Sequence, residues 1–172
     1  MRYFNQLVTM AELVFLSLGS NVGDRSANLR AAIERLGDHG AVRAVSGFYE
    51  TEPVGPHDQP WFLNCVLTLE TDDSPEALLK KVLAIEQEMG RLRTRDKGPR
   101  SIDIDILLFG DRVVDERGLK IPHPGIHQRR FVLEPLAEIA PEALHPQLRK
   151  TARELLADLP PGQIVRRLKP KT

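Results

Sequence analysis

Apolar residues follow two periods along the chain, and their succession predicts the order of the secondary-structure elements. Apolar residues three and four apart, the helical spacing, mark 24–37 and 74–90. Mostly apolar runs of strand length mark 14–18, 42–51, 61–69 and 102–109. The predicted order is therefore strand, helix, strand, strand, helix, strand.

Turn and cap residues agree with this order and extend it. Asp24 and the Ser74-Pro75 pair are typical helix starts, and Gly37 and Gly90 are typical helix ends. The pattern then predicts a small hairpin near 113–121 and helices at 131–139 and 151–159. This corresponds to an α+β, ferredoxin-like βαββαβ fold: a four-stranded, mainly antiparallel sheet with helices on one face and a C-terminal extension. Many functions occur on this fold, so the fold alone does not decide among them.

Length and composition predict one domain in a reducing compartment. A chain of 172 residues, 41% of them hydrophobic, can bury one core, which we expect over 12–172 after a leader at 1–11 that is a candidate for disorder. Basic and acidic residues both number 24, which gives no general attraction to nucleic acid. No apolar run reaches the roughly 20 residues that span a bilayer, and the single cysteine, Cys65, lies in an apolar run. We expect a cytoplasmic protein, a monomer or weak dimer, without nucleic-acid or membrane partners.

One predicted strand carries carboxylates. Asp103 and Asp105 alternate with isoleucines, so both point to one face, with Cα atoms about 7 Å apart. Like charges on one face repel unless a cation lies between them, and paired carboxylates without nearby His or Cys suit Mg²⁺. The plain alternative is the wet face of an amphipathic strand.

Arginines precede this strand. Arg91, Arg93 and Arg100 carry planar guanidinium groups that match phosphate oxygens. Together with the two aspartates they predict a magnesium-dependent polyphosphate site. Arginines that serve only solubility are the alternative.

Other features are candidates for a pocket, each with a structural alternative. Phe62 and Asn64 share a strand face that suits a flat heterocycle, although core packing also explains Phe62. Glu86 borders the apolar stripe of its helix and either orients an arginine, touches a ligand or is exposed. His123 lies between two prolines, which favours a positioned side chain, although a lone histidine is more often structural. The segment 19–23 lacks the sequence of a phosphate loop, so we interpret it as a tight turn.

In chain order, these motifs resemble the 6-hydroxymethyl-7,8-dihydropterin pyrophosphokinases of folate biosynthesis. The most specific piece is Gly98-Pro99-Arg100-Ser101-Ile102-Asp103-Ile104-Asp105. The remaining pieces are Leu18-Gly19-Ser20-Asn21, Phe48-Tyr49-Glu50-Thr51, Gly55-Pro56-His57-Asp58-Gln59-Pro60, Phe62-Leu63-Asn64, Glu86 with Gly90-Arg91-Leu92-Arg93, and Pro122-His123-Pro124 with Arg129 and Phe131.

The resemblance implies an ATP-dependent diphosphotransferase that moves pyrophosphate from ATP to the hydroxymethyl group of a reduced pterin and releases AMP. It implies two Mg²⁺ ions on Asp103 and Asp105, and a catalytic set completed by Arg91, Arg93 and Arg100. The nucleotide contacts that it implies are Glu86, the three arginines, the backbone near Ile106, His123 and Arg129. The pterin ring would lie between Phe62 and Phe131, with its edge against Asn64 and the backbone around Thr51 and Val54.

The chain departs from the family in one loop. Lys97 stands where many members have an aromatic residue, and the arginine loop is slightly short, which bears on how the loop closes over the pterin. Two other function classes use the same features: a Mg²⁺-dependent phosphohydrolase and a non-catalytic ligand-binding module. A pocket for a second substrate favours transfer over hydrolysis, and a binding module does not need paired carboxylates opposite three arginines.

Overall fold

An antiparallel sheet forms the centre of the computed structural model, which describes residues 11–53, 58–90 and 101–169. The strand order is β5-β1-β4-β3-β8, and β2 also pairs with β4. The bounds are β1 Glu12–Ser20, β2 Ala41–Val45, β3 Tyr49–Thr51, β4 Phe62–Thr71, β5 Asp103–Phe109 and β8 Val165–Arg167. A separate antiparallel hairpin consists of β6 Val114–Glu116 and β7 Leu119–Ile121.

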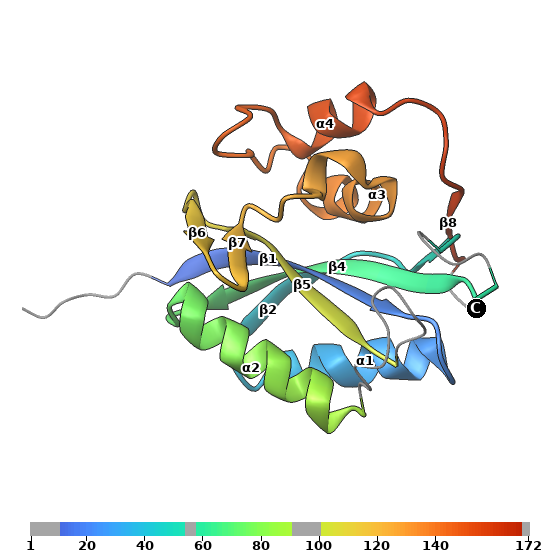
Figure 1. Cartoon of the computed structure of the whole chain (residues 1–172), viewed down its shortest axis with the longest axis horizontal. Helices are drawn as coiled ribbons and strands as arrows, with labels where there is room; N and C mark the ends of the chain where they lie inside the picture. Colours follow the sequence, from blue (N-terminus) through green and yellow to red (C-terminus); the bar gives the residue numbers. More distant parts are fainter. Residues whose placement is uncertain (1–10, 54–57, 91–100, 170–172) are drawn as a thin grey trace, which may run out of the picture.

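Helices cover both faces of this sheet (Figure 1). One face packs against α1 Arg25–Leu36 and α2 Pro75–Glu88, and the other against α3 Arg130–Ile139, with α4 Ala152–Asp158 outside it. A short 3-10 turn, Ile126–Gln128, precedes α3. Two hydrophobic clusters result, and β4 contributes to both because alternate side chains face opposite ways: Cys65 and Leu67 belong to the first cluster and Val66 to the second.

The predicted combination of helices with an antiparallel sheet is confirmed, and so are the helix starts. Asp24 accepts a hydrogen bond from the Ala27 N–H at 3.0 Å, and Ser74 accepts one from the Ala77 N–H at 3.2 Å. Cys65 is buried, and burial raises the pKa of its thiol to about 12. The cysteine is therefore an unreactive core residue.

Three details of the prediction are wrong. The run 42–51 is not one strand but two, because Ser46 interrupts the ladder: its hydroxyl accepts a hydrogen bond from the Val66 N–H at 3.0 Å and donates one to Gly47 O. The sheet also has more than four strands, since β8 adds to β3. Finally, the helices of the C-terminal extension, α3 and α4, cover the second face of the sheet, whereas the prediction placed helices on one face.

None of the helices in the described part of the chain has the length and apolar character needed to cross a bilayer. Except for its last residue, the predicted leader 1–11 lies outside the described residues.

Candidate active site

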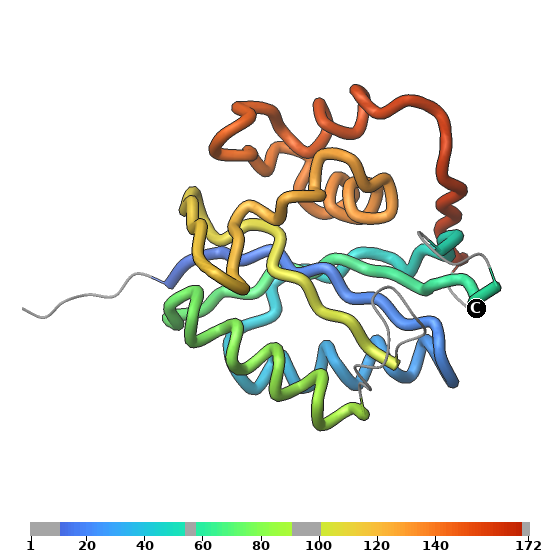
Figure 2. The backbone as a smooth tube through the Cα atoms, in the orientation of Figure 1, coloured from blue at the N-terminus to red at the C-terminus, as the bar shows by residue number. Residues whose placement is uncertain are grey.

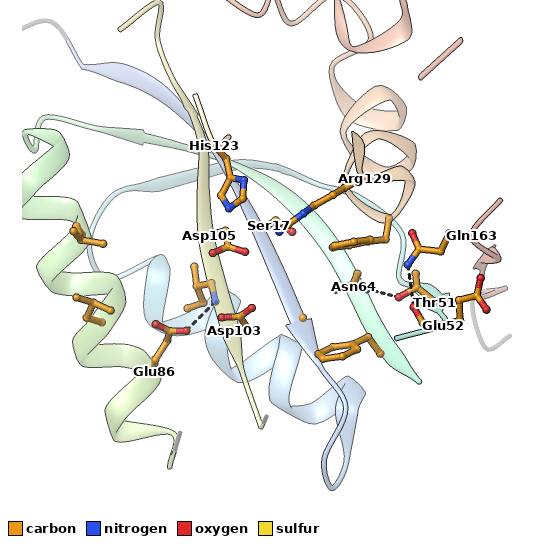
Figure 3. A pocket seen from close by; sticks show the side chains of 16 residues that line it. Ser17, Thr51, Glu52, Asn64, Glu86, Asp103, Asp105, His123, Arg129 and Gln163 are labelled. Atoms are coloured by element: carbon orange, nitrogen blue, oxygen red, sulfur yellow. Dashed lines mark hydrogen bonds between the residues drawn. The ribbon is translucent and has the colours of Figure 1, made fainter. Parts of the chain in front are cut away.

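A cavity of about 340 Å³ opens between β1, β4 and β5, the helices α2 and α3, and the segment that leads into β8 (Figure 3). Its lining includes nine of the residues singled out from the sequence: Thr51, Phe62, Asn64, Glu86, Asp103, Asp105, His123, Arg129 and Phe131. The other predicted residues Val54, Arg91, Arg93 and Arg100 lie outside the described residues.

The two aspartates lie on β5 above a floor of small residues. In the pairing of β5 with β1, Asp103 is opposite Gly19 and Asp105 is opposite Ser17. Residues opposite each other in a sheet project to the same face, so the small side chains leave space beside both carboxylates. The described residues include no group of three or more His, Cys, Asp or Glu side chains that could hold a metal by themselves. The two aspartates offer carboxylate oxygens, which suit an ion that takes further oxygens from water and phosphate, as Mg²⁺ does.

Glu86 fixes the strand between the two aspartates. Its side chain is 2% exposed, so the surface alternative is wrong, and its Oε2 accepts a hydrogen bond from the Ile104 N–H at 3.1 Å. Because β5 ends the sheet order, this N–H depends on a partner outside the sheet. Glu86 thus holds the backbone that carries Asp103 and Asp105.

His123 projects into the cavity as a neutral hydrogen-bond donor. Its backbone N–H donates to Leu107 O at 2.9 Å, and its Nδ1 accepts from the Gly125 N–H at 3.0 Å, so the imidazole proton is on Nε2. Burial and the neighbouring Arg129 lower the pKa of His123 to about 4, against an opposing effect of Asp103. We call Glu86, Asp103, Asp105 and His123 the acidic side of the cavity.

The opposite side combines amide, hydroxyl and aromatic groups. Asn64 and Thr51 are 4% and 1% exposed, and the Asn64 Nδ2 donates to Thr51 Oγ1 at 2.6 Å (Figure 3). A Cβ on Gly19 would lie 2.5 Å from Asn64 Oδ1, so only glycine allows this close approach. Phe62 comes from β4 and Phe131 from α3, and both line the cavity. We call Thr51, Phe62, Asn64 and Phe131 the amide–aromatic side.

A second cavity of about 300 Å³ continues along β5 and shares Asp105 and His123 with the first. Ile106, predicted to contact the nucleotide, lines this second cavity rather than the first. The described site is therefore extended, with His123 at the junction of the two cavities.

The lining also contains residues that were not singled out from the sequence. They are Ser17, Glu52, Leu79, Leu83 and Gln163. Ser17 follows from the register of β1 against β5, which the sequence does not fix. Gln163 has no sequence signal, because β8 was not predicted.

The chain is similar to known proteins in sequence and in fold. The sequence model of the 7,8-dihydro-6-hydroxymethylpterin-pyrophosphokinase family matches residues 15–141. The chain is 46% identical over 155 residues to the 2-amino-4-hydroxy-6-hydroxymethyldihydropteridine pyrophosphokinase of Methylorubrum extorquens, covering 88% of this chain and 96% of the relative. It is 46% identical over 132 residues to the protein of that name from Bacillus subtilis, covering 76% of this chain and 79% of the relative.

Longer proteins match as well. The chain is 44% identical over 154 residues to the folic acid synthesis protein fol1 of Schizosaccharomyces pombe, covering 88% of this chain and 21% of the relative. It thus spans about a fifth of that protein's length. The crystal structure of Plasmodium falciparum HPPK-DHPS superposes with a TM-score of 0.67 at 17% identity, covering 86% of this chain and 44% of that chain. This structural likeness shows the fold alone. The sequence matches also show the family: the chain belongs to the 7,8-dihydro-6-hydroxymethylpterin-pyrophosphokinase family.

Proposed function

We propose that the chain transfers pyrophosphate from ATP to the hydroxymethyl group of 6-hydroxymethyl-7,8-dihydropterin, a step in folate biosynthesis. The observation that carries this proposal is that one cavity is lined by two different surfaces, the acidic side and the amide–aromatic side. Family membership and the names of the bacterial relatives support it. A hydrolase acting through the aspartates, or a binding module, would not need both surfaces.

In the proposed reaction the pterin hydroxyl oxygen forms a bond to the β-phosphorus of ATP. The bond from that phosphorus to the α,β-bridging oxygen breaks, AMP leaves with the bonding electrons, and the hydroxyl proton passes to solvent. This chemistry needs no covalent nucleophile from the protein, because positioning and charge neutralisation supply the rate.

The acidic side is proposed to hold the charged reactants. Asp103 and Asp105 would bind two Mg²⁺ ions, which when bound neutralise phosphate charge and polarise the phosphorus centre. Arg91, Arg93 and Arg100 are proposed to clamp the phosphates. His123 is neutral near pH 7, so its Nε2–H donates to a nucleotide oxygen without adding charge, and Arg129 supplies a further cation.

The amide–aromatic side is proposed to hold the pterin. The rings of Phe62 and Phe131 would stack against its faces, as flat heterocycles prefer. The bond from Asn64 to Thr51 fixes the amide whose remaining donor and acceptor atoms meet the polar edge. The backbone around Thr51 and Val54 completes this edge in the proposal.

We also propose that the core follows the ferredoxin-like plan. Its support is that, when β2 and β3 count as one interrupted strand, the order β5-β1-β4-β2/β3 is the fourth, first, third and second strand of a βαββαβ chain. A cytoplasmic location and the absence of nucleic-acid partners rest on composition and stay proposals, as does a monomeric or weakly dimeric state.

The experiment that tests the proposed function follows the nucleotide products. The protein is incubated with Mg-ATP, with and without 6-hydroxymethyl-7,8-dihydropterin, and the products are separated by chromatography. We expect one AMP for each pterin diphosphate, no ADP, and little ATP consumption without pterin. Stoichiometric ADP would indicate an ordinary kinase, and pterin-independent phosphate release would indicate a hydrolase.

A further inference from the structure

The segment that ends in β8 forms part of the cavity wall, although it is far in sequence from every predicted site residue. After α4 the chain passes from the helix layer to the sheet, where β8 pairs with β3 (Figure 2). In this pairing Thr51, a member of the amide–aromatic side, is opposite Val165. Just before the strand, Gln163 lines the cavity (Figure 3).

Gln163 is held against the backbone next to Thr51. Its Nε2 donates to Glu52 O at 2.9 Å, while Glu52 Oε1 accepts from the Ile164 N–H at 2.9 Å. Among the described residues, Glu52 is the one hydrogen-bonding partner of the Gln163 side chain. A primary amide has two N–H donors and a carbonyl oxygen, so one donor and one acceptor remain for a ligand.

We propose that Gln163 is a specificity-determining residue for the pterin, its side-chain amide hydrogen-bonding the polar edge of the heterocycle beside Asn64. The inference rests on the proposed function and deepens it. Three features support it: the position of Gln163 in the wall, the fixed orientation given by Glu52, and the polar groups of Thr51 and Asn64 on the same side of the cavity. A site built from paired donors and acceptors selects ligands that match them, because an unmatched polar group is costly to bury.

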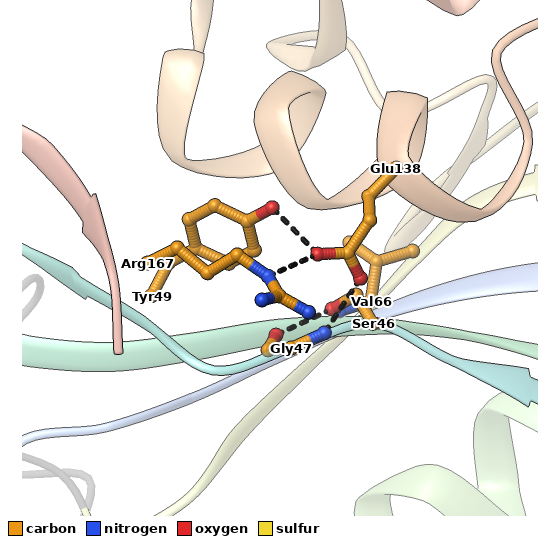
Figure 4. A network of polar contacts seen from close by, with 6 residues as sticks. All are labelled: Ser46, Gly47, Tyr49, Val66, Glu138 and Arg167. Carbon is orange, nitrogen blue, oxygen red and sulfur yellow. Dashed lines mark hydrogen bonds and ion pairs between the residues drawn. The ribbon is translucent and has the colours of Figure 1, made fainter. Parts of the chain in front are cut away.

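A network outside the cavity holds this wall in place (Figure 4). Glu138 on α3 accepts hydrogen bonds from Arg167 Nε at 2.6 Å, the Tyr49 hydroxyl at 2.9 Å and the Gly47 N–H at 2.7 Å. Arg166, the residue before Arg167, has its guanidinium 5.4 Å from the Trp61 ring centroid. Successive residues of a strand point to opposite faces, so β8 is fastened on both faces of the sheet. Glu138 and Arg167 are thus positioning residues for Gln163.

The first test is a titration of full-length protein with 6-hydroxymethyl-7,8-dihydropterin in the presence of a non-hydrolysable ATP analogue, followed by steady-state kinetics. Gln163→Ala should weaken pterin binding and raise the KM for pterin about tenfold, with the KM for ATP unchanged. Gln163→Leu, which keeps the bulk, should show the same loss. Gln147→Ala, at an exposed position, is the matched control and should behave as wild type.

The second test addresses positioning. Arg167→Ala should raise the KM for pterin about threefold at unchanged KM for ATP, and Arg167→Lys should recover part of the loss, because a point charge still pairs with Glu138. Arg153→Ala, which removes an exposed pair with Glu142, should change neither constant.

The outcomes separate this inference from the proposed function. If wild type forms the pterin diphosphate and Gln163→Ala or Gln163→Leu binds pterin normally, the inference alone is overturned. Equal losses for pterin and ATP would also overturn it, since they indicate a general structural role. If wild type binds pterin without transferring pyrophosphate, the proposed function is wrong, and the titrations still decide the role of Gln163. Wild type that binds no pterin overturns both.

Discussion

The two sides of the cavity are built on different principles. The acidic side places two carboxylates on the outermost strand of the main sheet, next to His123 and the buried Glu86. The amide–aromatic side instead consists of neutral groups, and its polar pair, Asn64 and Thr51, is almost completely buried. One side offers charge and oxygen ligands, and the other offers shape and a fixed hydrogen-bonding pattern.

The difference corresponds to what each side is proposed to bind. Mg²⁺ keeps part of its water and takes oxygen ligands, so two carboxylates on one strand face suffice for it, and the phosphates in turn pair with cations. A flat neutral heterocycle gains affinity from close contact and matched hydrogen bonds, which need a rigid frame. Substitutions on the acidic side should therefore affect turnover most, and those on the opposite side should affect pterin affinity most.

The largest effect is expected at the aspartates. Asp103→Asn or Asp105→Asn should lower kcat by about 10³-fold or more. Each change removes a negative charge that is proposed to bind Mg²⁺, and Mg²⁺ is proposed to neutralise the phosphates. Both side chains are half-buried on β5, so the fold should be retained. Initial rates over a range of Mg²⁺ concentrations, with thermal unfolding as a check, measure this. Asp72→Asn, at an exposed position, is the control; near-wild-type rates with normal Mg²⁺ dependence in the Asp103 and Asp105 variants would contradict the assignment.

The next largest effect is expected at Arg100, which lies outside the described residues and follows Gly98-Pro99 in the sequence. Arg100→Ala should lower kcat more than it weakens ATP binding. The expected loss of transition-state stabilisation is roughly 3 kcal/mol, which is typical of one strong transition-state donor. Arg100→Lys should not restore the full rate, because lysine lacks the planar fork. Steady-state kinetics combined with direct ATP-binding measurements separate the two contributions. An unchanged kcat in the alanine variant would remove Arg100 from the catalytic set.

A smaller effect is expected on the amide–aromatic side. In Gly19→Ala the added Cβ would lie 2.5 Å from Asn64 Oδ1, so the amide must move away from its bond to Thr51. We expect a loss of pterin affinity of about tenfold or more and a decrease in unfolding free energy of about 1–3 kcal/mol. The KM for ATP should change less than pterin affinity does. Gly162→Ala, whose added Cβ meets nothing within 4 Å, is the control; equal pterin binding in both variants would show that the amide position is not important.

The sequence predicted the aspartates of the acidic side better than the residues that long-range strand pairing brings to the cavity. Asp103 and Asp105 were predictable because period-2 alternation places both on one face whatever the strand's neighbours are. Phe62 and Asn64 were predictable for the same reason. Glu86 was left undecided, because its bond to the Ile104 N–H depends on how α2 packs against the edge of the sheet.

The residues that were missed depend on long-range pairing. Ser17 lies in the floor of the cavity only because of the register of β1 against β5. Gln163 enters the cavity because β8 adds to β3, and that strand is only three residues long, too short for a periodic signal. Ser46 splits one predicted strand by a side-chain hydrogen bond that mimics a backbone bond, which hydrophobicity does not reveal.

His123 is the exception on the acidic side, since burial and Arg129 make it a neutral group there. Its pKa falls from the ordinary 6.5 to about 4 on folding. The unfolded chain therefore binds more protons than the folded one between these two pH values. The stabilising contribution is fully present above pH 6.5 and is lost as the pH falls toward 4.

The smallest expected effect follows from this difference. In ligand-free protein, His123→Asn should reduce the decrease in unfolding free energy between pH 6.5 and 4, because asparagine does not titrate. Its Oδ1 can still accept from the Gly125 N–H, so the local turn should persist. Part of the decrease will remain, since burial also lowers the pKa of His145. Urea unfolding at several pH values measures the slope, with His39→Asn, at the turn after α1, as the control. Equal slopes in wild type and His123→Asn would mean that folding does not lower the pKa of His123, and His123 would then gain its proton near the ordinary pH of 6.5 instead of staying neutral down to about pH 4.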